Sequence, residues 1–555
     1  MQEIVSDPNA ICVIGSGPVG LSFALRLADA DQPVVLIDSG DLVGDAQQEF
    51  LGGTMANAAR ASDCQDTTLL PSGTLYARHS YMTRSRYLGS GGASQLWCVK
   101  WRPEAESRVR IVRSAAADFE ARPDFDIPSW QVPGDDITRH YDAAMAFFDL
   151  GGHDFEAARY GAEQSPLGLS QELFPTKLFH FPLAISVFQN RMAEARQHDG
   201  ISVLSNLHFL RFETKAHDWV RSIIVADRDG QEQRLVAHHF VLALGGIENS
   251  RQLLLAVEDG ALLDEHGVFG RWFFDHPHTR LGYLNSADPG ALTDQASWYD
   301  FQEYDGTPIM RGHEIAPDIA RTEGLLRFSI DLVARPPNDD TIAGAAVADM
   351  WDRFRGRNYL GGLSYLPKLA AHPLMAYRIA RTALNTRVHN TGHGGWSDPA
   401  QRNHDVGSLA VEAMFEQRPS PDNRIRLGYK RDPFGRRMPV LQWSWSAKEA
   451  EAINRAAEFV GAEFTRAGAG QFVPMRDLRR GAVPRAGSGF HHMGGTRQST
   501  DATSGVVNGN NRMHGVENLT LIGSSIFPNT TGYANPTLTA VADALRTADH
   551  LRQSA

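Results

Sequence analysis

Cysteine is scarce in this sequence. Only Cys12, Cys64 and Cys98 occur among 555 residues, and no two of them form a CxxC pair. Three scattered cysteines supply neither a disulfide framework nor a zinc or haem-attachment motif, so we expect no metal site. The same usage suits a reducing compartment, which predicts a cytoplasmic protein.

Long apolar runs and a basic excess are also lacking. No stretch approaches the ~18 uninterrupted apolar residues of a transmembrane helix, and residues 1–9 lack the basic and then apolar order of a secretion signal. Because 65 acidic residues outnumber 54 basic ones, the formal net charge is −11, which argues against a nucleic-acid partner. The hydrophobic fraction of 42% is typical of a globular protein, and the length allows for roughly three domain-sized units.

What the sequence does contain begins with a glycine-rich turn. An apolar run at 10–14 leads into Gly15-Ser16-Gly17-Pro18-Val19-Gly20, which is followed by a helical pattern through Ala28 and a second apolar run at 33–37. Glycines permit close approach to a pyrophosphate, and an acid after the second strand can receive ribose hydroxyls. The pattern predicts a dinucleotide site, with an ordinary strand–helix turn as the alternative, and it leaves the choice between FAD and a nicotinamide cofactor open. The predicted contacts are Gly15, Gly17, Pro18, Val19, Gly20, Asp38 and Ser39.

Two further glycine turns are candidates for the same site. Within 84–97, the run Ser90-Gly91-Gly92-Ala93-Ser94 could bring backbone N–H groups against an anion or a flavin edge, although a surface loop is the alternative. Residues 204–244 alternate as strands do, with turns near 218 and at 229–230, and a Gly-Gly return follows; a simple β-meander fits equally well. The predicted cofactor contacts here are Arg86, Gly91, Gly92, Ser94 and Gly245.

The stretch 487–551 joins a histidine turn, a strand and a helix. His492 opens the turn His492-Met493-Gly494-Gly495-Thr496, and residues 518–523 have the apolar content and glycine stop of a buried strand. Pro536 can begin a helix because its missing N–H has no helical partner there. His492 and Asn535 are therefore both expected at the ends of elements, where they can face one cavity. A buried structural histidine and an asparagine N-cap are the alternatives.

Four runs near the end of the chain resemble, in this order, the closing signature of the glucose–methanol–choline (GMC) flavoprotein oxidoreductases. They are His492-Met493-Gly494-Gly495-Thr496, Val506-Val507, Gly523-Ser524-Ser525-Ile526-Phe527-Pro528 and Ala534-Asn535-Pro536-Thr537-Leu538-Thr539. The variant is most similar to the branch of pyranose oxidases, glycoside 3-oxidases and sugar dehydrogenases. The resemblance implies that FAD is the cofactor, that His492 is the catalytic base and that Asn535 is its partner, whereas His491, one position off the motif, is expected to be structural. It further implies cofactor contacts from Gly523, Asn535, Pro536 and Thr537.

The resemblance also implies a fold. We expect an α/β chain, α+β overall, in which a Rossmann-like FAD-binding domain spans 1–280 and 480–555. An inserted, mainly antiparallel-sheet substrate-binding domain is expected at 281–479, and within it residues 447–464 read as a helix. Segment 359–395 interleaves apolar and basic residues, which predicts a lid or a homo-oligomer contact, with a membrane-surface or partner-binding helix as the alternative.

Two histidine positions of the family bear on chemistry. At the second glycine motif pyranose oxidases read Gly-Gly-x-Ser-x-His-Trp, with the histidine joined covalently to FAD, but this sequence has Gln95 and Leu96 there. Neither side chain can form a histidyl–flavin bond, so we expect non-covalent FAD. His276 lies in an Asp-His-Pro turn that is similar to a turn of the family, and we expect it to be structural because such a turn can be held by its own hydrogen bonds.

We therefore expect oxidation of a secondary ring hydroxyl of a sugar or glycoside. A hydroxyl proton must leave while hydride travels to the flavin, so a base is needed beside the ring, and His492 fits that need. Electrons would pass to O2 or another acceptor. The alternatives are a dehydrogenase with a non-oxygen acceptor, a GMC-like lyase without net redox, and a nicotinamide dehydrogenase or non-catalytic nucleotide-binding protein.

Overall fold

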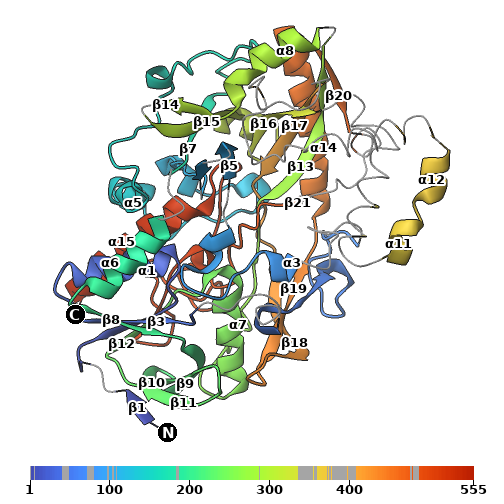
Figure 1. Ribbon diagram of the computed structural model, residues 1–555. Helices are drawn as coiled ribbons and strands as arrows, with labels where there is room; N and C mark the ends of the chain where they lie inside the picture. The colour runs from blue at the N-terminus through green and yellow to red at the C-terminus, as the bar shows by residue number, and fades with distance from the viewer. Residues whose placement is uncertain are drawn as a thin grey trace.

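The computed structural model describes residues 2–4, 7–40, 49–71, 81–96, 99–102, 105–107, 109–182, 187–286, 288–304, 306–335, 350, 354, 359–371, 373, 377, 397, 408–475, 478 and 487–554. Figure 1 shows two main regions: a parallel sheet with helices in the lower part, and a large antiparallel sheet beside the long helix α14 (Ala447–Ala467) in the upper part. The expected α/β class, with a parallel sheet and an antiparallel one, is confirmed.

The parallel sheet has five strands in the order β22-β12-β2-β3-β8, and each neighbouring pair is parallel. Its strands are β22 (Leu519–Leu521), β12 (His239–Leu242), β2 (Ile11–Ile14), β3 (Val34–Asp38) and β8 (Ile201–Ser205). Every residue of the four strands other than β8 is buried, which is why these strands read as continuous apolar runs in the sequence. Because the strands are parallel, the turns that follow β2, β12 and β22 meet at one edge.

Helices cover this sheet, and a smaller sheet adjoins it. Helices α1 (Pro18–Ala28), α6 (Val187–Gln197) and α15 (Pro536–Ser554) lie side by side in Figure 1. The small sheet runs β1-β11-β10-β9, with β1 (Gln2–Ile4), β9 (His208–Lys215), β10 (Trp219–Ala226) and β11 (Glu232–Leu235). The strands predicted within 204–244, with turns near 218 and 229–230, are therefore confirmed.

The large antiparallel sheet runs β14-β15-β16-β17-β13-β20. Its strands are β14 (Gln302–Tyr304), β15 (Thr307–Glu314), β16 (Phe328–Arg335), β17 (Ser408–Phe415), β13 (Pro277–Asn285) and β20 (Gln471–Pro474). Off this path, β7 (Thr176–His180) pairs with β15, and the short β21 (Gly487–Ser488) pairs with β13. Helix α14, predicted at 447–464, begins with a capping box of Ser446 and Glu449 and ends at Gly468 in the left-handed conformation.

A fourth sheet joins segments from both expected domains. Strand β4 (Thr54–Asn57) runs parallel to β19 (Arg437–Trp443), which pairs with β18 (Arg424–Arg431). Helix α7 (Gly245–Glu258) packs on β18 and β19. In addition, β13 begins at Pro277 and β7 lies near residue 180, so the antiparallel sheet includes residues from before position 281. The domain limits at 280 and 480 stay a prediction.

Short elements complete the described chain. The helices are α3 (Tyr81–Arg84), α4 (Gly134–Thr138), α5 (Tyr141–Phe147), α8 (Pro289–Ala296), α9 (Pro317–Thr322), α11 (Tyr359–Leu363) and α12 (Leu366–Ala370), and β5 (Val99–Arg102) pairs with β6 (Ala105–Ser107). Throughout the part of the chain that the structure covers, every helix is too short or too polar to cross a membrane.

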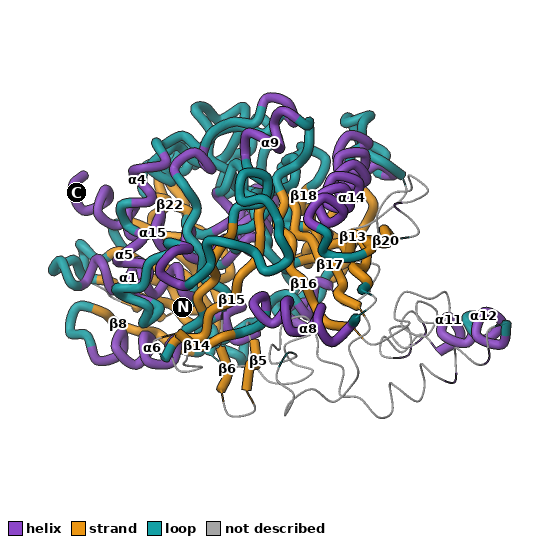
Figure 2. Tube along the Cα trace, turned by 90° about the horizontal axis from the view of Figure 1, so that it is seen from above, coloured by secondary structure: helices purple, strands orange, loops and turns teal. Residues whose placement is uncertain are grey.

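Helices α11 and α12 belong to the segment predicted as a lid or oligomer contact. Figures 1 and 2 both show them standing apart from the sheets. Their apolar side chains are open to solvent, with Leu360 85% exposed and Tyr359 61% exposed. Most of the remaining part of 359–395 lies outside the described residues, so its role stays a prediction.

Candidate active site

A cavity of about 2050 Å³ runs from the edge of the parallel sheet to the large antiparallel sheet. On one side it is bordered by Gly15, Gly245 and Gly523, which follow β2, β12 and β22. On the other side it is bordered by residues of β13 and β16, among them Arg280 and Asp331. Ordinary ligand pockets measure about 300–1,000 Å³, so this cavity has room for a dinucleotide together with a substrate.

Two glycines of the first turn, Gly15 and Gly20, have no room for a side chain. Gly15 has a φ of 114°, and a Cβ atom there would lie 2.6 Å from the carbonyl oxygen of Ala243. A Cβ atom on Gly20 would lie 2.0 Å from the carbonyl oxygen of Gly15. Gly17 caps α1, and Pro18 and Val19 border the cavity. The amino end of α1 therefore faces the cavity, where its N–H groups and dipole favour an anion.

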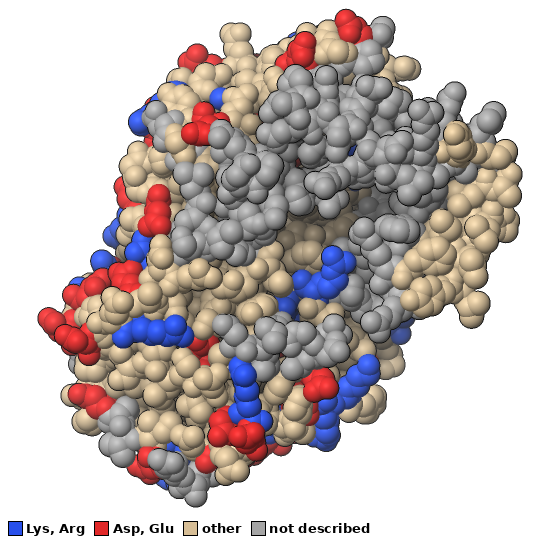
Figure 3. Space-filling view, in the orientation of Figure 1, with Lys and Arg blue, Asp and Glu red and all other residues tan. Residues whose placement is uncertain are grey.

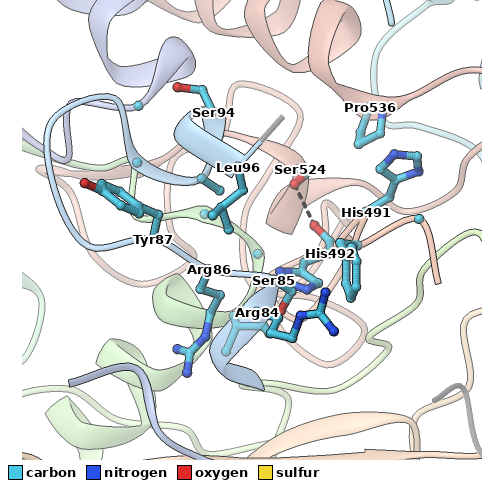
Figure 4. A pocket seen from close by; sticks show the side chains of 18 of the residues that line it. Arg84, Ser85, Arg86, Tyr87, Ser94, Leu96, His491, His492, Ser524 and Pro536 are labelled. Atoms are coloured by element: carbon cyan, nitrogen blue, oxygen red, sulfur yellow. Dashed lines mark hydrogen bonds between the residues drawn. The ribbon is translucent and has the colours of Figure 1, made fainter. Parts of the chain in front are cut away.

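The second glycine turn lies opposite the first. Gly91 and Gly92 both have positive φ, and the hydroxyl of Ser94 donates to the carbonyl of Gly91 at 2.6 Å. A Cβ atom on Gly92 would lie 3.6 Å from the Cα atom of Gly17, so the two turns face each other. Gly92 and Ser94 border the cavity, and so does Leu96, which is labelled in Figure 4.

Asp38 holds the second glycine turn. Its carboxylate is buried at the end of β3, where Oδ1 accepts from the backbone N–H of Gly40 at 3.0 Å and Oδ2 accepts from the hydroxyl of Ser90. Ser39 borders the cavity. Contact of Asp38 with a ribose stays a prediction, and holding Ser90 is a second use for the same carboxylate.

Arg86 borders the cavity, but its guanidinium is bound to protein groups. Nε donates to the carbonyl of Met82 at 3.0 Å, Nη1 lies 3.3 Å from Glu248, and Nη2 donates to the carbonyls of Leu51 and Gly52. Burial lowers the pKa of Arg86 to about 10, against the opposing effect of Glu248. This arrangement ties the 51–52 segment to α7, and direct contact of Arg86 with a cofactor stays a prediction.

The remaining predicted contacts also border the cavity. Gly245 has a φ of 83°, and no described atom lies within 4 Å of the position that its Cβ would take. Gly523 has a φ of 98° and follows β22. Pro536 and Thr537 form the start of α15, so a second helix amino end faces the same space.

His491, and not His492, is the partner of Asn535. Nε2 of His491 lies 3.0 Å from Nδ2 of Asn535, and both residues border the cavity. Figure 4 shows His491 beside Pro536. His492, the base predicted from the sequence, also borders the cavity, so its catalytic role stays a prediction, but the side chain that contacts Asn535 is that of the preceding residue. The physical reason is that the segment forms a β-bridge from Met493 to Phe274, and successive side chains of an extended segment point in opposite directions.

His492 points instead into an aromatic pocket at the cavity wall. Its ring centroid lies 5.5 Å from that of Tyr81 and 6.1 Å from that of Phe273, and its carbonyl accepts from the hydroxyl of Ser524 at 2.6 Å. Within the described chain, Nε2 of His492 is buried without a hydrogen-bond partner. Burial, together with Arg86, lowers the pKa of His492 to about 3.

His276 contacts the other nitrogen of His491. The two Nδ1 atoms are 2.8 Å apart, and Nε2 of His276 lies 2.6 Å from the carbonyl oxygen of Thr531. The turn is also held by Asp275, whose Oδ1 accepts from the backbone N–H of His276 at 2.7 Å and from that of His491 at 3.0 Å. The self-contained turn expected from the sequence is present, but the ring reaches across to a different segment. Pairing of β21 with β13 brings the two segments together.

Arg110 approaches Asn535 from the opposite side. Its Nε donates to Oδ1 of Asn535 at 3.1 Å, and its Nη1 lies 3.0 Å from a carboxylate oxygen of Asp331 on β16. Sequence reasoning missed both residues because no motif surrounds either of them. A lone arginine or aspartate gives no local sign of a contact that spans 425 positions.

The electrostatic surroundings keep the site histidines neutral. Burial, followed by the neighbouring His276, His278 and Arg110, holds the pKa of His491 well below its ordinary value. Burial raises the pKa of Asp275 to about 6, although hydrogen bonds from Ser488 and Tyr81 oppose this shift. A neutral His491 has one nitrogen able to accept a proton.

Charged groups form the far wall of the cavity. Nε and Nη2 of Arg280 lie 2.8 Å and 2.6 Å from Oε1 of Glu412, and Arg335 lies 3.3 Å from the same oxygen. Burial would raise the pKa of Glu412, but the two arginines lower it below its ordinary value. Figure 3 shows basic side chains beside a hollow, near the middle of the molecular face that is turned to the viewer. Such a wall offers both donors and acceptors to a polar ligand.

Two family models match this chain. Residues 10–272 match the FAD binding domain, and residues 419–544 match the GMC oxidoreductase model. Together the two matches support the GMC oxidoreductase superfamily for this chain and FAD as its cofactor. The cavity fits FAD for three reasons. The amino ends of α1 and α15 border it, and there is open space where a Cβ of Gly245 would lie. At its wall, Nε2 of His492 is buried without a partner among the described residues, so it can still form a hydrogen bond.

Three curated proteins are similar to parts of the chain. The fructose dehydrogenase large subunit of Gluconobacter japonicus is 31% identical over 113 residues, 19% of this chain and 21% of that protein. The 6'''-hydroxyparomomycin C oxidase of Streptomyces lividus is 28% identical over 144 residues, 26% of this chain and 25% of that protein. Paromamine 6'-oxidase of Streptomyces fradiae is 28% identical over 155 residues, 27% and 26% of the two chains. The matched segments span only a minor part of each relative.

Solved structures share the whole fold. Pyridoxine 4-oxidase from Mesorbium loti superposes with a TM-score of 0.53 at 15% identity, covering 98% of this chain and 99% of that one. An Aspergillus oryzae formate oxidase variant superposes with a TM-score of 0.53 at 14% identity, covering 99% of each chain. At this level of identity the likeness concerns the fold alone.

Proposed function

We propose that this protein oxidises a secondary ring hydroxyl of a sugar or glycoside to the keto-sugar, as in the pyranose oxidase, glycoside 3-oxidase and sugar dehydrogenase branch of the superfamily. FAD, when bound, supplies the acceptor for the hydride that leaves the carbon. The observation that carries the proposal is the contact of His491 with Asn535 at 3.0 Å, on the wall of the cavity that also holds the dinucleotide turns.

His491 is the base in this proposal. A substrate hydroxyl that replaces the direct contact of the two side chains donates its proton to Nε2 of His491 and accepts a hydrogen bond from Nδ2 of Asn535. The imidazole takes the proton, while the amide stabilises the negative charge that develops on the oxygen. Asn535 is suited to this because its own oxygen is held by Arg110, which turns the amide nitrogen toward His491.

A sugar is the substrate class that the far wall supports best. Arg280, Glu412 and Asp331 place fixed donors and acceptors opposite the base, and a molecule with several hydroxyls can use them all. The partly similar fructose dehydrogenase and paromamine 6'-oxidase carry sugar-like substrates in their names. Electrons then pass to O2 or another acceptor in a cytoplasmic protein, and segment 359–395 serves as a lid or as a homo-oligomer contact.

FAD is proposed to be held without a covalent bond. Leu96 stands at the position of the linking histidine in the family motif, borders the cavity and carries no nucleophile. Acid precipitation of the holoenzyme should release all flavin into the supernatant. A pellet that stays yellow after washing would show a linkage elsewhere.

The substrate class is tested by anaerobic flavin reduction. The yellow holoenzyme is mixed with D-glucose, D-fructose, methyl β-D-glucopyranoside, paromamine or pyridoxine, and the visible absorbance is followed without NAD. We expect a sugar or glycoside to bleach the flavin, and admission of air then separates an oxidase, which recovers its colour and forms hydrogen peroxide, from a dehydrogenase. Bleaching by pyridoxine alone would refute the sugar assignment, and a flavin that no alcohol bleaches would favour a non-redox lyase.

A further inference from the structure

We propose that His276 is a positioning residue, which fixes the proton of His491 on Nδ1 and so leaves Nε2 free to act as the base. This inference rests on the proposed function, because it concerns the base assigned there. It follows from a chain of hydrogen bonds whose two ends each allow only one direction of donation.

The first end of the chain is Arg110. A guanidinium carries donors and no acceptor, so the atom that faces Nε of Arg110 at 3.1 Å must be the amide oxygen of Asn535. The amide nitrogen then faces His491, and an amide nitrogen only donates. Nε2 of His491, 3.0 Å away, must therefore be the unprotonated nitrogen of a neutral imidazole.

The second end is the backbone carbonyl of Thr531. A carbonyl oxygen only accepts, so Nε2 of His276, 2.6 Å away, carries a proton. In a neutral imidazole the other nitrogen then lacks one, and Nδ1 of His276 is an acceptor. Its partner at 2.8 Å is Nδ1 of His491, which must donate. The hydroxyl of Thr530, 2.9 Å from Nε2 of His276, can accept as well and does not disturb this order.

The two ends give the same answer for His491. Reasoning from Arg110 leaves Nε2 without a proton, and reasoning from Thr531 puts the proton on Nδ1. One assignment therefore satisfies all four contacts, and reversing either histidine would set two donors or two acceptors against each other. A chain that agrees from both directions presets the base before any substrate arrives.

The surroundings keep this assignment in place. His276 is fully buried, and burial followed by His278 and Arg110 lowers its pKa to about 3, so its Nδ1 stays an acceptor at ordinary pH. When His491 takes up a proton at Nε2, its Nδ1–H still has that acceptor. His276 thus supports both the neutral and the protonated state of the base, whereas a side chain without an acceptor supports neither.

A matched pair of variants isolates the acceptor. His276→Asn and His276→Leu are similar in size, and both lose the ring and the bond to Thr531, but only asparagine offers an oxygen near the former Nδ1 position. We expect His276→Leu to lower the rate of flavin reduction by the best sugar of the panel on the order of 10²-fold. The loss should be smaller than when a catalytic histidine loses a carboxylate that fixes its tautomer, because His276 is neutral. His276→Asn should stay within about tenfold of the unchanged protein.

Two further readouts separate positioning from general damage. The loss in His276→Leu should fall on the limiting rate of reduction and leave the sugar concentration for half-maximal rate nearly unchanged, because Asn535 and the far wall are untouched. FAD content and thermal melting are measured for both variants. Equal losses in His276→Asn and His276→Leu with normal FAD content would overturn the inference.

The tautomer itself can be observed without altering His276. Holoenzyme labelled with 15N at histidine is compared with the His491→Gln protein, which identifies the two ring signals of His491. We expect Nδ1 to have the 15N chemical shift of a protonated imidazole nitrogen, and Nε2 to have that of an unprotonated one. The opposite assignment would overturn the inference even if both His276 variants failed to fold.

The inference and the proposed function fail in different ways. If His491→Ala is reduced by sugar at the normal rate, the base lies elsewhere and the proposed function falls. If His491→Ala is inactive but the 15N shifts place the proton on Nε2, the base stands and the role of His276 falls.

Discussion

The cavity has two walls whose sequence motifs behave differently. In the nucleotide turn (15–20) the decisive atoms belong to the backbone, since a Cβ on Gly20 would lie 2.0 Å from the carbonyl of Gly15. In the base turn (487–496) the decisive atoms belong to side chains, and two adjacent histidines both border the cavity. A glycine motif can be placed on the chain in one register only, because its neighbours have side chains that would clash. With two adjacent histidines, the residue that acts in the site can be assigned only from the direction in which each ring points.

Replacing each histidine in turn tests the base turn most strongly. Removing a positioned base lowers the rate of proton transfer by roughly 10²–10⁴-fold, so His491→Ala should bind FAD and be reduced by sugar that much more slowly in anaerobic stopped-flow. His492→Ala is compared per bound FAD, because His492 also borders the cavity, and each bound flavin should keep most of its reductive rate. A normal rate in His491→Ala with a large loss in His492→Ala would restore the register expected from the sequence.

The nucleotide turn is tested by adding one methyl group. Gly20→Ala places a Cβ inside the contact distance of a backbone carbonyl that cannot move aside, and overpacking of this kind destabilises by about 1–3 kcal/mol. We expect lower FAD content and a lower melting temperature. Gly151→Ala is the control, since its new Cβ would lie 3.7 Å from Ala146 and outside the cavity. Equal behaviour of the two variants would contradict the close packing at Gly20.

The sequence predicted the frame of the fold well. The strands at 10–14 and 33–37, the helix through Ala28, helix α14 and the helix beginning at Pro536 are all confirmed. Each of these elements has a local cause, such as a continuous apolar run, a capping residue or a proline at the first turn. Predictions that depend on local backbone preferences need no knowledge of the distant chain.

The side-chain network of the site could not be predicted in the same way. Arg110, His276 and Asp331 come from separate segments and meet through the pairing of β21 with β13 and the position of β16. The contact between His276 and His491 spans 215 positions, and no pattern near either residue records it. The family resemblance pointed to this turn and gave His492 as the partner of Asn535, whereas the histidine that contacts Asn535 is His491.

Asp38 offers a smaller test on the nucleotide side. Loss of hydrogen bonds to a charged group costs about 1.5–3 kcal/mol, so Asp38→Ala should weaken FAD binding if the carboxylate holds the ribose. Ser90→Ala removes the hydroxyl that donates to the same carboxylate. We expect the FAD affinity of Asp38→Ala to fall well below that of Ser90→Ala. Equal affinities in the two variants would leave Asp38 with the single task of fixing the second glycine turn.

The smallest expected effect is that of pH on the reductive step. A base works in its neutral form, and the pKa of His491 is held well below its ordinary value by burial and by His276, His278 and Arg110. Lowering the pH from 8 to 5.5 should therefore leave His491 neutral and the rate of flavin reduction nearly constant. A histidine of ordinary pKa, about 6.5, would lose roughly tenfold over that range. Burial raises the pKa of Asp275 to about 6, so an inflection near pH 6 in the rate profile that disappears in Asp275→Asn would belong to Asp275. An inflection that persists in Asp275→Asn would show that His491 titrates as a solvent-exposed histidine does. Water would then reach the cavity wall more than its packing implies.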